Sequence, residues 1–327
     1  MHAFLTGGTG FLGGELVRLL VGGGWKVTAL HRPSSEMTRL RAAAVTPVEG
    51  TLEDADSLRR AMPEGVDAVF HVAAVVSFWS RRDQEQTRAN VIGTRNVVEA
   101  ALASGAGRFV HTSSIAAFGR HAGIITESTP SNAASSDIRY LQTKALAEEE
   151  VRRGMDRGLD AVFLNPANIL GPGDSAHWAK LLQMVDRGHL PGLPPGRGSF
   201  CHVREVALAH LRAFERGRTG HHYLLGGADA DYAVVAREAA RILGRTIPER
   251  TLPLWAFRIL GRALEWGSHL TGKEPAITPE KASLASTHMV CSSEKASREL
   301  GYRTPTLTEM LEESVAWLRS EGLLSSM

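Results

Sequence analysis

The chain has 327 residues, 43% hydrophobic and 22% charged, which is enough for roughly two domains and too apolar for extensive disorder. Lysine plus arginine (37) nearly balance aspartate plus glutamate (35), so the net charge of +2 argues against a nucleic-acid partner and favours a small molecule. Only Cys201 and Cys291 are present, which excludes a disulfide framework, predicts no metal site and favours a reducing, cytoplasmic compartment.

The sequence also predicts neither a signal peptide nor a transmembrane segment. Met1 is followed within a few residues by a glycine-rich turn, which leaves no room for the apolar core of a leader. The longest apolar stretch, residues 252–270, is interrupted by Arg258, Arg262 and Glu265, so we do not expect it to span a bilayer.

The first two hundred residues alternate short apolar runs with longer helical patterns, which is typical of crossover units and a parallel sheet. The expected strands are residues 3–6, 26–30, 68–72, 109–112 and 160–164. The expected helices are residues 11–21, 54–62, 84–104 and 138–153. This order predicts an α/β fold with a doubly wound parallel sheet of the Rossmann type.

A glycine-rich turn follows the first expected strand and opens the first expected helix, with Gly7, Gly10 and Gly13 at a spacing of three. Glycine permits positive φ in a tight turn, lets a pyrophosphate approach the backbone and lets the helix pack closely on the strand. The helix N-terminus then attracts the negative charge. The turn therefore predicts a dinucleotide site, and a turn that only reverses the chain is the alternative.

The end of the second expected strand distinguishes two dinucleotides. NAD sites usually present a carboxylate there, whereas NADP sites tend to present a cation to the 2′-phosphate. This chain has His31-Arg32-Pro33-Ser34-Ser35, without a carboxylate, and the Arg32 guanidinium suits bidentate phosphate binding. We therefore expect NADP(H) as the preferred cofactor and NAD(H) as a possible one, with a solvated loop charge as the alternative for Arg32.

Tyr140 and Lys144 are four residues apart in an expected helix, so their side chains share one face. They follow Ser113 and Ser114 at the end of an expected central strand, where ligands of such folds bind. A phenol with a pKa of about 10 is a poor base unless an ammonium stabilises the phenolate, which Lys144 could do. With Ser114 donating to a substrate carbonyl, Tyr140 could exchange the proton during hydride transfer. The alternatives are an exposed helix face for the pair and local capping for the serines.

After Pro166 the pattern changes, and a stretch rich in proline and glycine at residues 190–198 interrupts the alternation. Residues 202–216 are expected to form a strand end and a helix that return to the first domain. We predict a dinucleotide-binding domain of residues 1–165 plus about 200–220. Residues 166–199 plus 221–327 would form a smaller C-terminal α/β substrate-binding domain.

Several motifs together resemble the extended short-chain dehydrogenase/reductases, also called the NAD-dependent epimerase/dehydratase family, over almost the whole chain. They are TGGTGFLGG at residues 6–14, HVAA at 71–74, NVIGT at 90–94, TSS at 112–114, YLQTK at 140–144 and NPANILGP at 165–172. The resemblance implies that Ser114, Tyr140 and Lys144 form the catalytic triad, with Lys144 also holding the nicotinamide ribose.

The resemblance also implies the remaining cofactor contacts. These would be Gly7, Gly10 and Gly13 in the turn, the backbone amides of Phe11 and Leu12 at the pyrophosphate, Leu52 on the adenine ring, Ala73 against the cofactor, and Pro166 with Ile169 beside the nicotinamide. Thr51 replaces an aspartate that the family often carries, which puts the acidic contact to adenine in doubt. Asn90 is implied to organise the structure around the cofactor. Family members often form homodimers through the helices that here contain Asn96 and Tyr140.

Two further features indicate which branch of this family the chain resembles. Members that act on nucleotide-sugars usually carry an arginine where this chain has Gly198, whereas HVAAVVSFW at residues 71–79 resembles the dihydroflavonol-reductase-like and 3β-hydroxysteroid-dehydrogenase-like branch. We therefore predict an NADP(H)-dependent oxidoreductase that interconverts a ketone or aldehyde and its alcohol on a small, apolar substrate. The alternatives are a nucleotide-sugar epimerase or dehydratase with tightly bound NAD, and a non-catalytic NADP-sensing protein. The aromatic residues that would line an apolar pocket, or belong to the core, are Phe78, Trp79, Trp178, Trp255, Phe257 and Trp266.

Overall fold

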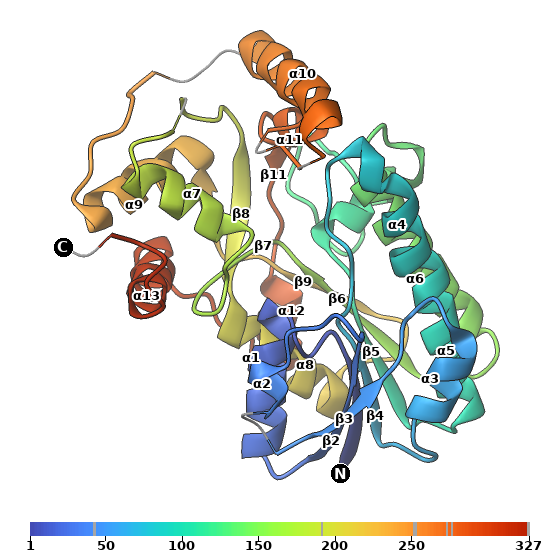
Figure 1. The fold of residues 1–327 in the computed structure, drawn as a ribbon. Helices are drawn as coiled ribbons and strands as arrows, with labels where there is room; N and C mark the ends of the chain where they lie inside the picture. Colours follow the sequence, from blue (N-terminus) through green and yellow to red (C-terminus); the bar gives the residue numbers. More distant parts are fainter. Residues whose placement is uncertain (42–43, 191, 251–253, 273, 276, 326–327) are drawn as a thin grey trace.

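The structure is a computed structural model that describes residues 1–327 except 42–43, 191, 251–253, 273, 276 and 326–327. Its centre is a seven-stranded parallel sheet in the order β3-β2-β1-β4-β5-β6-β9 (Figure 1). The strands are β1 (His2–Thr6), β2 (Lys26–His31), β3 (Thr46–Glu49), β4 (Ala68–His71), β5 (Arg108–Thr112), β6 (Ala161–Pro166) and β9 (His222–Leu225). The predicted doubly wound sheet is confirmed, and its order reverses between β1 and β4.

All five expected strands belong to this sheet, which contains two further strands that were not expected. Strand β3 contains Pro47 and is largely exposed at the sheet edge, so it lacks the apolar run that identifies a strand in sequence. Strand β9 is only four residues long and pairs with β6 at the other edge. The division into two domains stays a proposal, and β9 is the part of residues 221–327 that belongs to the first sheet.

Helices cover both faces of this sheet (Figure 1). On one face, α1 (Phe11–Gly22) and α8 (Val203–Arg216) pack on each other and on apolar side chains of the strands, so α8 lies against the first sheet. On the other face lie α3 (Ala55–Ala61), α5 (Gly93–Ala103) and α6 (Arg139–Met155). The central strands β4 and β6 are buried along their whole length because both faces are covered.

The helix expected at residues 84–104 is built in three parts. It begins as α4 (Asp83–Thr87), passes through the π-helical turn η2 (Arg88–Ile92) and continues as α5. Such a turn inserts an extra residue into the helix and is frequent at functional sites. The remaining short helical elements of the first half are α2 (Thr38–Arg41), η1 (Ser80–Arg82), η3 (Ile115–Phe118) and η4 (Ala133–Ser135).

The C-terminal half builds a smaller sheet around β8 (Arg197–His202), which pairs with β7 (Asn168–Leu170), β10 (Ala228–Asp231) and β11 (His288–Met289). The helices of this half are α7 (Trp178–Asp186), α9 (Tyr232–Leu243), α10 (Leu254–Thr271), α11 (Pro279–Leu284), α12 (Glu294–Leu300) and α13 (Leu307–Ser320). A separate core of α7, α9 and α13 side chains packs on this sheet. Among the helices of the described ranges, none is both long enough and apolar enough to cross a bilayer.

Phe70 tests the packing between the first sheet and α8. Its side chain on β4 is fully buried and contacts the rings of Trp25 and Phe214 at centroid distances of 6.1 and 6.4 Å. Phe70→Ala should lower the free energy of unfolding by about 3–5 kcal/mol, since it leaves a cavity in the core. Chemical denaturation followed by circular dichroism measures the loss. Trp266→Ala, at a side chain that is 82% exposed, is the control, and equal midpoints for the two variants would contradict this packing.

Candidate active site

The glycine turn lies where the strand order reverses. Gly7 follows β1 with φ of +79°, and a Cβ atom there would lie 2.7 Å from the backbone nitrogen of Ala73, just beyond β4. A Cβ atom on Gly13 would lie 2.0 Å from the carbonyl oxygen of Gly7. The turn therefore requires glycine at both positions, because backbone packs directly on backbone. The Thr6 Oγ1 atom joins the two segments by accepting from the Ala73 N–H at 3.2 Å.

The turn leaves the N-terminus of α1 free to bind an anion. Gly10 is the N-cap residue, no side chain caps the helix, and the first turn contains no carboxylate. The N–H groups of the first turn therefore carry the positive end of the helix dipole without an internal partner. Phe11 and Leu12 are the first residues of this helix, as a pyrophosphate site requires.

Leu52, the residue expected on the adenine ring, lies beyond the end of β3 and against α5. Its carbonyl oxygen accepts from Asn96 Nδ2 at 2.9 Å, and a Cβ atom on Gly93 would lie 2.8 Å from the Leu52 Cβ atom. The missing side chain of Gly93 thus lets Leu52 lie directly on the helix. Asn96 therefore holds the segment of Leu52 through this hydrogen bond. It also lies on α5, one of the two helices expected to form the dimer interface.

Two arginines lie on the β2 side of the turn. Arg32 directly follows β2 and is exposed, and its backbone N–H donates to Ser35 Oγ at 3.1 Å. Arg39 of α2 was not among the sequence candidates, yet its guanidinium donates to the carbonyl oxygens of Gly10 at 3.1 Å and Gly173 at 2.8 Å. Gly173 is 134 residues away in sequence, so no local pattern could have indicated this contact.

The structure brings the three expected catalytic residues together beyond the ends of β5 and β6. Ser114 precedes η3, where its Oγ atom accepts from the Ala116 N–H at 3.1 Å and donates to the Pro166 carbonyl at 3.4 Å. Tyr140 is half-buried in the first turn of α6, close enough to Ser114 for that residue to act on its ionisation. Lys144 is buried one turn later, and its Nζ atom donates to the Thr112 carbonyl at 3.1 Å.

Burial is the largest influence on the pKa values of Tyr140 and Lys144. It raises the pKa of Tyr140, and the hydrogen bond with Ser114 acts in the opposite direction. It lowers the pKa of Lys144 to about 8, while the Glu148 carboxylate acts to raise it. The sequence predicts that Lys144 lowers the pKa of Tyr140; in the structure desolvation raises this pKa because it penalises the phenolate, and Ser114, not Lys144, is the group that acts to lower it.

Asn90 holds the chain that leaves β4 against α6. Its Oδ1 atom accepts from the Val75 N–H at 2.7 Å, and its Nδ2 atom donates to the Val75 carbonyl at 2.9 Å and to Thr143 Oγ1 at 3.3 Å. Every hydrogen bond that the structure gives this side chain is thus to a neighbouring segment of the same scaffold. Ile169 lies half-buried in β7, where it pairs with Cys201 of β8.

The aromatic candidates separate into three groups. Phe78 packs edge-on against Tyr140 with ring centroids 5.4 Å apart, and Trp79 Nε1 donates to Ser268 Oγ of α10 at 3.1 Å, so these two lie beside the candidate site. Trp178 belongs to the second core. Trp255 and Trp266 are 67% and 82% exposed on α10, so the alternative that they belong to the core is wrong for these two residues. The Phe257 side chain lies outside the described residues.

Gly198 occupies a crowded position on β8. A Cβ atom there would lie 2.6 Å from Asn168 Nδ2 and 3.0 Å from the Tyr232 hydroxyl. The Nη1 atom of the neighbouring Arg197 lies 3.7 Å from the Oδ1 atom of Asp231. An arginine at position 198 would therefore not fit without rearrangement, and Arg197 has an acidic neighbour of its own.

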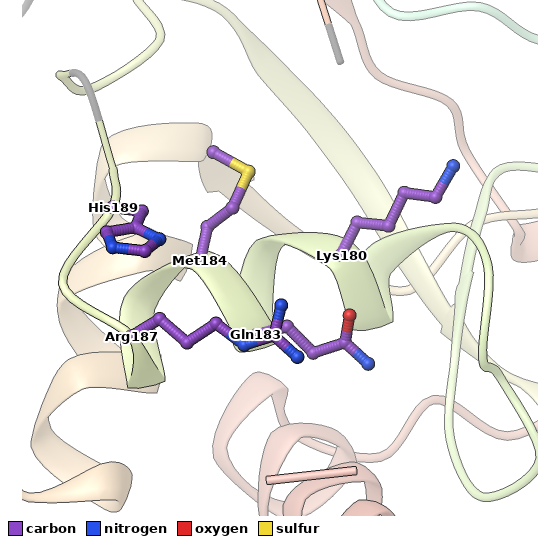
Figure 2. A pocket seen from close by; sticks show the side chains of 5 residues that line it. All are labelled: Lys180, Gln183, Met184, Arg187 and His189. Carbon is purple, nitrogen blue, oxygen red and sulfur yellow. The ribbon is translucent and has the colours of Figure 1, made fainter. Parts of the chain in front are cut away.

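A surface hollow lies apart from these residues, on α7 and the turn after it. Its volume is about 220 Å³, and its lining residues are Lys180, Gln183, Met184, Arg187 and His189 (Figure 2). Figure 2 shows that these side chains come from one helix and its end, and none of them is an expected site residue. The glycine turn and the ends of β5 and β6 therefore remain the candidate active site.

Three comparisons with known proteins agree with this geometry. Residues 3–226 match the model of the NAD dependent epimerase/dehydratase family. The chain is 32% identical to a Synechocystis protein assigned as a dihydroflavonol 4-reductase, over 99% of this chain and 96% of that one. It is 33% identical to the 4-hydroxy-2-methyl-3-oxo-4-farnesyl-3,4-dihydroquinoline-1-oxide ketoreductase of Stigmatella aurantiaca, over 92% of both chains. The crystal structure of gox2253 has a TM-score of 0.85 at 31% identity and 99% coverage of both chains.

Gly13→Ala tests the glycine turn. The added methyl group would collide with the Gly7 carbonyl, so we expect a loss of about 1–3 kcal/mol of stability and at least tenfold weaker NADPH binding. Cofactor fluorescence and thermal melting measure the two effects. Gly22→Ala, on the same helix but with no atom within 4 Å of the new methyl group, should bind NADPH as the parent does. Equal affinities for both variants would place the cofactor elsewhere.

Proposed function

Because this chain belongs to the NAD-dependent epimerase/dehydratase family and is an NAD(P)-dependent oxidoreductase, we propose that it interconverts a ketone or aldehyde and the matching alcohol. The observation that carries the proposal is the meeting of Ser114, Tyr140 and Lys144 at the edge of the sheet where the glycine turn also lies. The substrate would be small and apolar, and NADP(H) would be the preferred cofactor.

The residues at the crevice suit such a cofactor. The uncapped start of α1 would hold the pyrophosphate, with Gly7, Gly10 and Gly13 giving it access to the backbone. Leu52 and Ala73 would contact the adenine and the middle of the molecule, and Pro166 with Ile169 would lie beside the nicotinamide. When bound, the nicotinamide supplies or accepts a hydride at the reacting carbon.

The protein's own residues would then manage the substrate oxygen and its proton. Ser114 would donate a hydrogen bond to the carbonyl oxygen, and Tyr140 would give that oxygen a proton during reduction. Since burial raises the pKa of Tyr140, the phenol is protonated near neutral pH, which is the state that carbonyl reduction needs. Lys144 would hold the nicotinamide ribose and place a positive charge beside the phenol.

Two cations support the preference for NADP(H). Arg32 follows β2 at the position where NAD sites usually carry a carboxylate, and it is exposed and available to a 2′-phosphate. Arg39 adds a guanidinium held on the Gly10 and Gly173 carbonyls. An adenosine phosphate on this side of the turn would therefore meet two guanidinium groups.

The substrate side supports an apolar carbonyl compound. Phe78 packs against Tyr140, and Leu284 of α11 joins the same apolar cluster. The Stigmatella aurantiaca relative is named for a ketone that carries a farnesyl chain. The crowded Gly198 position disfavours a diphosphate clamp and thereby the nucleotide-sugar alternative. The presence of all three proton-handling residues disfavours a silent NADP-sensing protein.

The homodimer also stays a proposal. Helices α5 and α6 contact each other, and the ion pair between Arg95 and Glu150 joins them at 2.8 Å. Ile92, at the end of η2 just before α5, and Leu146 of α6 are exposed. These side chains would allow the pairing of both helices with a second copy that the family resemblance implies.

Tyr140→Phe should abolish NADPH-dependent reduction of an apolar ketone and leave NADPH affinity within about twofold, because the variant loses only the proton donor. Steady-state absorbance at the nicotinamide band and fluorescence titration measure the two quantities. The matched control is Tyr302→Phe, at a buried tyrosine whose hydroxyl donates to the Gly226 carbonyl, and this variant should remain active. Full activity of Tyr140→Phe would move the catalytic assignment to another residue.

Arg32→Asp should weaken NADPH binding by about 10- to 100-fold and change NADH binding much less, because only NADPH carries the 2′-phosphate. The control is Arg60→Asp, which makes the same charge change at an exposed residue of α3. It should leave the affinities for NADPH and NADH unaltered. Equal losses for NADPH and NADH would remove the case for NADP(H). Release of firmly held NAD from the denatured parent protein would instead support the epimerase alternative.

A further inference from the structure

One face of α6 carries four polar side chains at intervals of four residues: Tyr140, Lys144, Glu148 and Arg152. The proposed function uses the first two. Glu148 is only 4% exposed, and Arg152 reaches the surface at the far end of the row. A buried carboxylate is costly unless hydrogen bonds and counter-charges compensate it, so its presence one turn beyond Lys144 needs a reason.

Three donors hold the Glu148 carboxylate. Its Oε1 atom accepts from Ser113 Oγ at 2.5 Å and from Asn165 Nδ2 at 2.8 Å, and its Oε2 atom accepts from Arg152 at 3.0 Å. Ser113 follows β5 and Asn165 lies in β6. The carboxylate therefore joins α6 to the ends of the two strands that carry the candidate active site.

The same bonds reach the catalytic candidates. Asn165 Nδ2 also donates to the Ser114 carbonyl at 3.1 Å, and Ser113 lies between Ser114 and Thr112, whose carbonyl accepts from Lys144. Thr112, Ser113 and Ser114 are thus all held by hydrogen bonds with the cluster formed by Lys144, Glu148 and Asn165. A change at Glu148 would disturb the backbone under Ser114 and the anchor of Lys144 together.

The charges around Lys144 single out Glu148. His71 of β4 and His111 of β5 also face the ammonium, but burial lowers the pKa of His71 to about 3 and that of His111 well below its ordinary value, so both are neutral. Glu148 is the group that acts to raise the pKa of Lys144. The groups that face Glu148 itself are Arg152 and His222 of β9.

His222 completes the far side of the cluster. Its Nδ1 atom lies 3.7 Å from Glu148 Oε1 and bonds Asn165 Oδ1 at 3.0 Å, and Arg152 contacts its Nε2 atom at 3.1 Å. Burial lowers the pKa of His222 although Glu148 acts to raise it, so the ring is neutral near neutral pH. Arg152 therefore supplies the positive charge that faces Glu148 from the surface.

We infer that Glu148 is a positioning residue: its buried carboxylate provides the counter-charge of the Lys144 ammonium and holds the backbone on which Ser114 and Lys144 depend. The inference rests on the proposed function only for the role of Lys144. Glu148 would not touch the substrate or the cofactor. It would act by keeping Lys144 protonated and in place at a pH where burial alone would release the proton.

The test compares Glu148→Gln, Glu148→Asp and Glu150→Gln with the parent protein. Glu150 is an equally buried acid of α6, but it pairs with Arg95 and Arg153 away from Lys144. NADPH affinity is titrated by fluorescence from pH 6 to 10 without substrate, and the alkaline limb of ketone reduction is measured separately. Since burial lowers the pKa of Lys144 to about 8, we expect both quantities to fall above that pH in the parent.

Glu148→Gln should move both alkaline limbs down by about one pH unit, because it removes a nearby opposite charge. Glu148→Asp keeps the charge at a greater distance and should lie between that variant and the parent, while Glu150→Gln should match the parent. Unchanged limbs in a folded Glu148→Gln protein would overturn the inference. If that variant does not fold by circular dichroism, a parent-like limb for Glu148→Asp would overturn it. Absence of ketone turnover in the parent would contradict the proposed function, and the NADPH titration would still decide the role of Glu148.

Discussion

The close approach of two backbone segments, at Gly7 and at Ala73, is the constraint on which the rest of the site depends. Strands β1 and β4 are neighbours, and the sheet order reverses between them. Their exits can meet only if no side chain separates them, and Gly13 brings the start of α1 onto the same turn. The uncapped helix end is thereby directed to the edge where β5 and β6 deliver Ser114 and Pro166. The groups that we propose for anion binding and for proton chemistry thus share one edge of one sheet.

Burial then sets the protonation of the residues at this edge. Desolvation raises the pKa of Tyr140 and lowers that of Lys144, so both side chains are driven toward their neutral forms. A reductase can use a protonated phenol, but it needs a charged lysine. In the proposed mechanism Glu148 meets the second need, because its carboxylate lies in the same helix as Lys144 and is bonded to Ser113 after β5 and to Asn165 in β6. The stability of the buried carboxylate and the charge of the lysine therefore support each other.

The C-terminal half adds apolar side chains beside Tyr140. Leu284 of α11 joins Phe78 and Tyr140 in one cluster, and α10 contacts the chain after β4 through Ser268 and Trp79. Figure 1 shows α10 and α11 together above the ends of the first sheet. These side chains come from segments that are far apart in the chain, so they meet only in the folded protein.

The sequence by itself determined the elements whose signals are local. Strands β1, β2, β4, β5 and β6 follow from apolar runs, the turn follows from glycine spacing after a strand, and the shared face of Tyr140 and Lys144 follows from helical periodicity. Tertiary structure alone decided what depends on distant contacts or on burial. Arg39 reaches Gly173, β9 extends the first sheet, Trp255 and Trp266 turn to solvent, and desolvation raises the pKa of Tyr140. The physical reason is that sequence spacing records which residues share a face, whereas charge, exposure and long-range contacts depend on what the fold packs against that face.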